Sequence, residues 1–308
     1  MARMDMKIAG FRIKNPVLTA SGTCGYGKEL NQIFPIEKLG GIMVKGTSLE
    51  PRKGNPTPRI AETPSGVLNC VGLQNPGLEE VLRNQLPWIT SKDLAVIVNI
   101  AGREAEDYGR VAKAISGVPN VAAIEVNISC PNVKAGGMAH GSRPETAAEV
   151  TREVKANTTL PVIVKLSPNV TNIVEIAKAV EEAGADALSL INTILAMEID
   201  IETGKPLLGN QVGGLSGPAI RPIAVRMVWQ VAQAVDIPII GMGGIATGRD
   251  ALQFMMAGAS AVAVGSATMV DPMAPLRIAQ EMEEWLDEHD IPSVKDIIGI
   301  ALPPKIDL

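Results

Sequence analysis

The sequence predicts an α/β fold, a (β/α)8 TIM barrel, from two observations. Eight short apolar runs recur along the 308-residue chain, and most are separated by a stretch with helical spacing. The runs are continuous in Val, Ile, Leu and Ala, which is typical of parallel strands buried on both faces under covering helices. Eight such units in succession predict a closed barrel. The predicted strands are residues 17–21, 41–45, 94–99, 122–127, 162–165, 187–192, 237–241 and 261–265.

Three of the intervening segments carry clear helix signals. Residues 171–182 repeat apolar positions at helical spacing, and Gly184 marks the stop. Pro218 is predicted near the start of a helix that runs through Ala234, because proline suits the first helical turn. Thr247-Gly-Arg-Asp250 has the spacing of a capping box, with Asp in place of the usual Glu or Gln.

Three connections are too long for simple strand-to-helix loops, and long ordered loops are usually functional. Residues 54–77 contain a hairpin turn signal at Pro64-Ser65-Gly66, and residues 193–217 contain another at Glu202-Thr203-Gly204. The third is 130–141. Since all three follow strands, we expect long loops and small antiparallel hairpins over the C-terminal face. No linker divides the chain, so we expect one barrel domain over residues 1–308, which carries the catalytic site.

Composition excludes several function classes. The net charge of −5, with no basic run, argues against a nucleic-acid partner. No apolar run approaches the ~20 residues of a membrane span, and residues 1–7 lack a signal-peptide pattern, so we expect a soluble cytoplasmic protein. Cys24, Cys70 and Cys130 are widely spaced, which predicts no disulfide framework and no metal site. The chain also has too few cysteines for an iron–sulfur cluster of its own.

Every predicted strand ends in a polar, charged or glycine residue. Active sites of these barrels lie at the carboxyl-terminal ends of the strands, so we expect these side chains to converge. Strand ends can be polar simply because they meet water, but two lysines and three asparagines ending runs of Val and Ile favour a site. The residues are Ser21, Lys45, Asn99, Asn127, Lys165, Asn192, Gly243-Gly244 and Gly265-Ser266.

Cys130 follows the fourth strand, in Asn127-Ile-Ser-Cys-Pro-Asn-Val-Lys-Ala-Gly-Gly137. Pro131 ends the strand and biases Cys130 toward an extended backbone. The segment therefore places a thiol at a strand end, beside an amide and under a loop that Gly136-Gly137 would allow to move. A cysteine can also be a small buried hydrophobe, and the thiol alone does not decide between the two readings.

The glycine-rich ends of the last two strands favour a phosphate group. Gly241-Met-Gly-Gly244 and Gly265-Ser266 offer backbone N–H groups where such barrels often bind phosphate. Phosphosugars, nucleotides and FMN all satisfy this pattern. Lys45 and Lys165 require an anion, because a charge in a barrel mouth is costly without one. A reduced flavin or a substrate carboxylate would supply it, and Schiff-base chemistry is the rival use.

Several motifs together resemble dihydroorotate dehydrogenase, over nearly the whole chain. They are Asn127-Ile-Ser-Cys-Pro-Asn132, Lys45-Gly46-Thr47, Asn69 to Leu73, Lys165-Leu-Ser-Pro168, Ile191-Asn-Thr193, Gly214-Leu-Ser-Gly217 and Gly243-Gly244. The stretch from Leu207 to Met227 looks most like the catalytic subunit of the NAD-linked, two-subunit class.

The resemblance implies a set of site residues. Cys130 would be the catalytic base, where the membrane-bound class has serine. FMN would be held by Ser21, Lys45, Gly46, Asn99, Asn127, Lys165, Ile191 and Gly217, with its phosphate on Gly243, Gly244, Gly265 and Ser266. Dihydroorotate would contact Lys45, Asn69, Cys70, Val71, Gly72, Leu73, Asn127, Asn192 and Thr193.

The resemblance also implies a partner. No strand is followed by a G-x-G-x-x-G dinucleotide-binding unit. The resemblance to the two-subunit class implies that a second subunit, which carries FAD and an iron–sulfur cluster, passes the electrons to NAD. We expect a homodimer of this chain within a heterotetramer.

Four other functions fit parts of the pattern. A self-sufficient homodimer that reduces fumarate shares the cysteine and FMN. A Schiff-base lyase would use Lys165 or Lys45, and a cysteine-nucleophile dehydrogenase would act on a nucleotide. A non-enzymatic phosphate-binding barrel would use only the glycine-rich strand ends.

Overall fold

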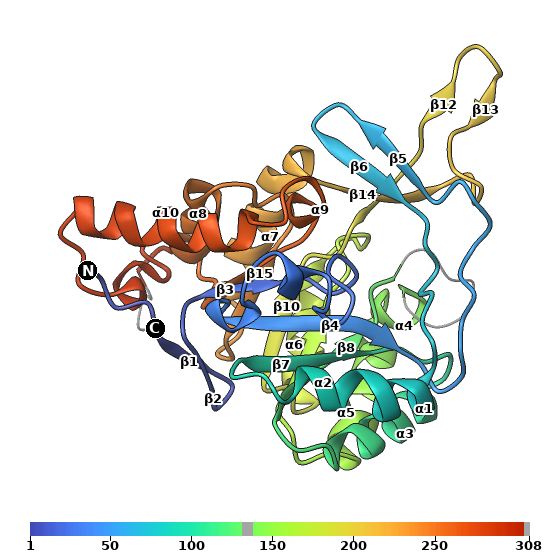
Figure 1. Cartoon of the computed structure of the whole chain (residues 1–308), viewed down its shortest axis with the longest axis horizontal. Coiled ribbons are helices and arrows are strands. Elements are labelled where there is room, and N and C mark those ends of the chain that lie inside the picture. Colours follow the sequence, from blue (N-terminus) through green and yellow to red (C-terminus); the bar gives the residue numbers. More distant parts are fainter. Residues whose placement is uncertain (131–137, 305–308) are drawn as a thin grey trace.

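The computed structural model describes residues 1–130 and 138–304, and its centre is a closed barrel of eight parallel strands (Figure 1). The barrel order is β3–β4–β7–β8–β9–β10–β15–β16, which follows the chain. All eight predicted runs are confirmed as strands. Their bounds are β3 Val17–Thr19, β4 Gly41–Thr47, β7 Ala95–Ile100, β8 Val121–Asn127, β9 Val162–Lys165, β10 Ala187–Leu190, β15 Ile239–Met242 and β16 Ala261–Val264.

Alternation along the strands separates two cores. Leu18, Met43, Ile97, Ile163 and Ile240 belong to the cluster that fills the barrel interior. Their chain neighbours belong to the larger cluster between the strands and the outer helices. Because successive side chains of a strand point to opposite faces, every second residue toward the carboxyl end of each strand also faces inward.

The outer helices pack against one another in sequence around the barrel, α3 on α5, α5 on α6, α6 on α7, α7 on α8 and α8 on α10. Within residues 1–130 and 138–304, no helix is both long and apolar enough to cross a membrane. The helices are α1 Leu78–Glu80, α2 Leu86–Ile89, α3 Ala105–Ser116, α4 Met138–Gly141, α5 Pro144–Ala156, α6 Ile173–Glu182, α7 Arg221–Ala232, α8 Gly248–Met256, α9 Ala267–Val270 and α10 Ala274–Glu288. Short 3-10 turns occupy Leu30–Gln32, Ile36–Lys38, Pro218–Ile220 and Val294–Ile297, and a π turn occupies Val81–Gln85.

The helix signals were read correctly, with small shifts of boundary. Helix α6 begins at Ile173 because Asn172 caps it, its side chain accepting a hydrogen bond from Val174 N at 3.1 Å. The predicted capping box is present, since Thr247 and Asp250 each accept from the other's backbone N–H. Pro218 starts a 3-10 turn that leads into α7, and α7 ends at Ala232.

The long loops fold into small antiparallel sheets on one side of the barrel (Figure 1). Four strands pair in the order β11 (Ile194–Ala196), β14 (Gly213–Ser216), β6 (Gly66–Asn69) and β5 (Ile60–Thr63). The hairpin of β12 (Ile199–Asp200) and β13 (Lys205–Pro206) projects furthest from the barrel.

Both predicted turns lie where expected, at Pro64-Ser65 between β5 and β6 and around residues 202–204 between β12 and β13. Ser65 has φ 61° and Gly204 has φ 66°. The third loop, 130–141, includes residues 131–137, so the predictions for Pro131 and Gly136-Gly137 lie outside the described residues.

A further hairpin, which the sequence did not predict, lies near the amino ends of the barrel strands. Strands β1 (Met6–Ile8) and β2 (Phe11–Ile13) pair through Ala9-Gly10. Both loop residues have positive φ, 45° and 91°, as a type I′ turn requires. Met6, Ile8 and Ile13 join the cluster that fills the barrel interior, so the hairpin closes this end and leaves the carboxyl end open.

We predict that Ile8→Ala destabilises the protein by about 2–5 kcal/mol, the usual cost of removing a large aliphatic side chain from a core. Ile8 is 1% exposed within the interior cluster. The measurement is urea unfolding. Lys7→Ala, on the exposed side of the same strand, is the control and should stay within about 0.5 kcal/mol of wild type. Equal effects of the two changes would show that the hairpin does not close the barrel.

Candidate active site

A cavity of about 210 Å³ opens at the carboxyl ends of the barrel strands. It is bounded by strand ends on one side and by the loop strands β6 and β14 on the other. Most residues predicted to bind a cofactor or substrate therefore meet in one place. Those that line it are Ser21, Lys45, Gly46, Asn69, Val71, Gly72, Leu73, Asn99, Asn127, Cys130, Lys165, Ile191, Asn192, Thr193, Gly243, Gly244, Gly265 and Ser266.

Two of the predicted residues lie off the cavity wall. The Cys70 side chain is fully buried in a cluster with Leu68 and Leu208, and its Sγ donates to Pro58 O at 3.6 Å. The segment is extended, so Asn69 and Val71 face the cavity while Cys70 faces away. Gly217 does not line the cavity but packs against Gly244, which does. A Cβ built on Gly244 would lie 2.7 Å from the carbonyl oxygen of Gly217. The structure does not support substrate contact by Cys70.

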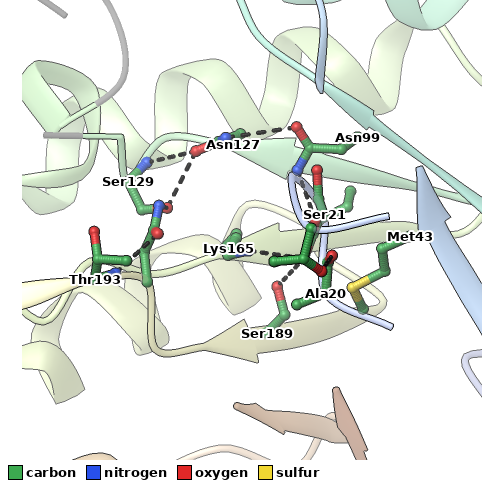
Figure 2. A network of polar contacts seen from close by, with 12 residues as sticks. Ala20, Ser21, Met43, Asn99, Asn127, Ser129, Lys165, Ser189 and Thr193 are labelled. Carbon is green, nitrogen blue, oxygen red and sulfur yellow. Dashed lines mark hydrogen bonds and ion pairs between the residues drawn. The ribbon is translucent and has the colours of Figure 1, made fainter. Parts of the chain in front are cut away.

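A chain of amide and hydroxyl groups forms the upper wall of the site (Figure 2). Asn127 Oδ1 accepts hydrogen bonds from Ser129 N at 3.3 Å and Ser129 Oγ at 3.2 Å. Asn192 Nδ2 donates to Ser129 Oγ at 2.8 Å, and Asn192 Oδ1 accepts from Thr193 N at 2.8 Å. Asn127 Nδ2 lies 3.5 Å from Asn99 Oδ1. These contacts fix which amide end each asparagine presents.

A buried carboxylate, Glu125, lies beneath this wall and was not singled out from the sequence. It is 0% exposed. Asn99 Nδ2 donates to its Oε2 at 2.6 Å, and Ser189 Oγ donates to its Oε1 at 2.7 Å. Lys165 Nζ is 4.0 Å from Oε1. The sequence held one signal: Glu125 is two residues before Asn127 on the same strand, so the two share the inward face.

The two lysines of the cavity differ in their charge environment. Lys165 is 5% exposed and has Glu125 at ion-pair distance. Lys45 is partly buried, and no ion pair with a carboxylate is recorded for it among the described residues. Burial lowers the pKa of the Lys45 ammonium, and the charge of Arg59 lowers it further. Lys45 is therefore the cation that an anionic ligand would stabilise most.

The three cysteines also lie in different settings. Cys130 is 7% exposed and is on the cavity wall. Cys24 lies beneath the wall, where its Sγ contacts Thr19 Oγ1 at 3.2 Å, and burial raises its pKa to about 11. Only a thiolate is nucleophilic or basic, so Cys24 is inert near neutral pH and Cys130 is the cysteine in position to react.

The glycine pair at the end of β15 forms a narrow cradle. Gly243 and Gly244 have φ 123° and 83°, and a Cβ on Gly244 would lie 2.7 Å from Gly217 O and 2.9 Å from Arg221 N. Side chains are therefore excluded, and bare backbone borders the cavity. Gly265 is different, because the nearest atom to a Cβ there would be 3.7 Å away. A cradle of this kind beside Ser266 fits the phosphate of a flavin mononucleotide.

Comparison with known proteins decides the family. The family model for dihydroorotate dehydrogenase matches residues 3–286. The chain belongs to the dihydroorotate dehydrogenase family. It is an FMN-dependent oxidoreductase family, and the resemblance drawn from the sequence motifs is confirmed.

Individual relatives show which class of the family the chain is most similar to. Dihydroorotate dehydrogenase B (NAD(+)), catalytic subunit, from Bacillus cereus (strain AH187) is 56% identical over 299 residues, 97% of each chain. The protein of the same name from Bacillus anthracis (strain A0248) has the same identity and coverage. Among solved structures, the dihydroorotate dehydrogenase of Eimeria tenella in complex with ferulenol is 23% identical. Its TM-score is 0.82, and the match covers 97% of this chain and 88% of that one; this likeness confirms the barrel fold of the dehydrogenase.

We predict that Lys45→Met removes a rise in stability at alkaline pH. The folded pKa of Lys45 lies below its ordinary value of 10.5, so between these two values the unfolded chain binds more protons than the folded one. Stability of the ligand-free wild type therefore rises with pH across this window, and the methionine variant lacks that increment. Urea unfolding from neutral pH to about pH 10 measures it. Lys178→Met, on the exposed face of α6, should follow wild type, and parallel curves for all three proteins would contradict the assignment.

Proposed function

We propose that this chain oxidises dihydroorotate to orotate as the catalytic subunit of an NAD-linked, two-subunit dihydroorotate dehydrogenase, in the cytoplasm and in de novo pyrimidine biosynthesis. One observation carries the proposal: a thiol, two lysines and four asparagines, brought together from several strands, line a single cavity beside a glycine cradle. The 56% identity to NAD(+)-linked catalytic subunits over 97% of the chain supports the class.

The residues divide into a cofactor side and a substrate side. The phosphate of FMN would lie on Gly243, Gly244, Gly265 and Ser266, which have bare backbone or a hydroxyl at the wall. FMN, when bound, accepts the hydride that leaves C6 of dihydroorotate. The proposed FMN residues are Ser21, Lys45, Gly46, Asn99, Asn127, Lys165 and Ile191 on the wall, with Gly217 supporting the cradle from behind.

The substrate side is built from amides and a cation. Asn69, Asn127 and Asn192 each carry both a donor and an acceptor, which match the amide edges of a pyrimidine ring. Lys45 provides a positive charge for a carboxylate, and Thr193 and residues 71–73 complete the wall.

Cys130 removes the C5 proton as the thiolate. Loss of this proton and of the C6 hydride leaves the C5–C6 double bond of orotate, so atoms and electrons balance. A general base must lie within hydrogen-bond reach of the proton that it takes, and Cys130 is the cysteine on the wall. His140 Nε2 donates to Arg103 O at 2.7 Å, and His140 is not among the lining residues.

The electron acceptor requires a second protein. We propose a subunit with FAD and an iron–sulfur cluster, and a homodimer of this single-domain barrel within a heterotetramer. The Bacillus relatives are named as catalytic subunits, which supports a separate electron-transfer subunit. A self-sufficient enzyme that reduces fumarate is the second candidate, since it would use the same cysteine and cofactor.

We predict that Cys130→Ala slows reduction of bound flavin by dihydroorotate about 10²- to 10⁴-fold, the usual contribution of a general base. Single-turnover absorbance in the absence of any acceptor measures this step. Cys24→Ala is the matched control, because Cys24 is equally buried but off the cavity wall, and it should reduce flavin at close to the wild-type rate. If Cys130→Ala matches wild type, the base is another group.

We also predict that the isolated chain reduces artificial dyes with dihydroorotate but reduces NAD⁺ at least tenfold more slowly than it does with its partner added. Steady-state assays with dye, NAD⁺ and fumarate separate the candidates. Full NAD⁺ turnover by the lone chain would refute the need for a partner. Rapid turnover with fumarate would assign the chain to the self-sufficient class.

A further inference from the structure

Glu125 lies one layer below the active site, inside the barrel. It is fully buried and is not on the cavity wall. In the barrel register, Glu125 of β8 pairs with Asn99 of β7, and Lys165 of β9 pairs with Ser189 of β10. Four adjacent strands therefore bring an amide, a carboxylate, an ammonium and a hydroxyl together in the barrel interior (Figure 2 shows Asn99, Lys165 and Ser189 of this group).

The hydrogen bonds of Glu125 fix the orientation of Asn99. A carboxylate oxygen only accepts, so Asn99 must turn its Nδ2 toward Glu125, and the 2.6 Å contact agrees. Asn99 Oδ1 is then left at the cavity wall, 3.5 Å from Asn127 Nδ2. Glu125 therefore determines that Asn99 presents its Oδ1 acceptor at the cavity wall, where it favours a ligand with an N–H donor.

The charge of Glu125 acts on Lys165. An ammonium that is 5% exposed requires a compensating charge or a strong set of acceptors. Glu125 is the one carboxylate recorded within 4.0 Å of Lys165 Nζ in the described part of the chain. Ser189 donates to the same oxygen at 2.7 Å and holds it in place. The ligand therefore meets an ammonium whose field is partly opposed from below.

We propose that Glu125 is a positioning residue for the flavin site, one that fixes Asn99 as an acceptor toward the cavity and balances the charge of Lys165. The proposal rests on the proposed function, since it takes the flavin as the ligand of this wall. A buried polar group can also serve stability alone, so the decisive measurements are ones that a purely structural role does not change.

Glu125→Gln keeps the shape and removes the charge. The amide that Glu125→Gln introduces has one oxygen and one NH₂ group. If the NH₂ group faces Asn99, the Asn99 amide must rotate to accept from it, and if it faces Ser189 and Lys165, the acceptor and the charge are lost on that side. Either choice disturbs one of the two functions of the carboxylate. Ser189→Ala removes a hydrogen bond and keeps the charge. Glu153→Gln is the matched control, because Glu153 also accepts from an asparagine, Asn157 Nδ2 at 2.9 Å, but on α5 outside the barrel.

The experiment measures FMN binding to the flavin-free chain by fluorescence quenching, and the midpoint potential of bound flavin at pH 6. We expect Glu125→Gln to weaken FMN binding at least tenfold. The variant should also bind reduced flavin about tenfold more favourably relative to oxidised flavin, because Glu125 no longer offsets the charge of the Lys165 ammonium. For a two-electron couple, a tenfold change raises the midpoint potential of the bound flavin by about 30 mV. Ser189→Ala should weaken binding less and leave the potential unchanged, and Glu153→Gln should match wild type in both.

The outcomes separate the two proposals. If wild type binds FMN and Glu125→Gln has the wild-type affinity and potential, the positioning role is wrong and the proposed function stands. If wild type itself does not bind FMN, the proposed function fails first. Should Glu125→Gln not fold, the double variant Glu125→Gln/Lys165→Met tests the charge pair. The double variant should be more stable than Lys165→Met alone, because breaking a buried pair costs more than removing it. A double variant that is less stable than Lys165→Met would overturn the pairing.

Discussion

Closure of the parallel barrel is the constraint on which every other feature depends. Each strand pairs with two parallel neighbours, so all eight carboxyl ends must lie at one rim. Residues as distant in the chain as Ser21 and Ser266 therefore share one cavity. The hairpin β1–β2 packs its apolar residues into the interior cluster near the amino ends, whereas the loop strands over the carboxyl ends leave a cavity between themselves and the strand ends. A cavity at the carboxyl-terminal rim follows from this asymmetry.

Alternation along the strands then arranges the interior in layers. Ile97 and Asn99 share the inward face of β7, Ala123, Glu125 and Asn127 share that of β8, and Ile163 and Lys165 share that of β9. The inward residues nearest the amino ends of these strands, Ile97, Ala123 and Ile163, are aliphatic and belong to the same cluster as the apolar residues of β1–β2. The middle layer holds the carboxylate with its donors, and the highest layer holds the amides of the wall. The polar layer is tolerated in the interior because both oxygens of Glu125 are hydrogen-bonded.

The sequence predicted those features that depend on local pattern. Eight apolar runs, the Thr247–Asp250 capping box and two hairpin turns are each determined within a few residues, and all are present. The β1–β2 hairpin was missed because its three-residue strands are too short for a periodic signal. The motif at residues 69–73 does not reveal which side chains face the cavity, because alternation along the extended segment turns the Cys70 side chain away from it. Glu125 was passed over as part of an apolar run, although a charge within such a run needs a partner.

The two lysines show how the same layers determine ligand charge. Lys165 pairs in register with Asn127, and its Nζ lies 4.0 Å from Glu125 Oε1, so the carboxylate opposes its charge. Lys45 stands on the wall where burial and Arg59 disfavour its protonated form, and no described carboxylate pairs with it. An anion that enters the cavity therefore gains most beside Lys45, where it restores a charge that the fold destabilises. The cavity thus combines one positive charge with no described carboxylate partner, at Lys45, with one that Glu125 compensates, at Lys165.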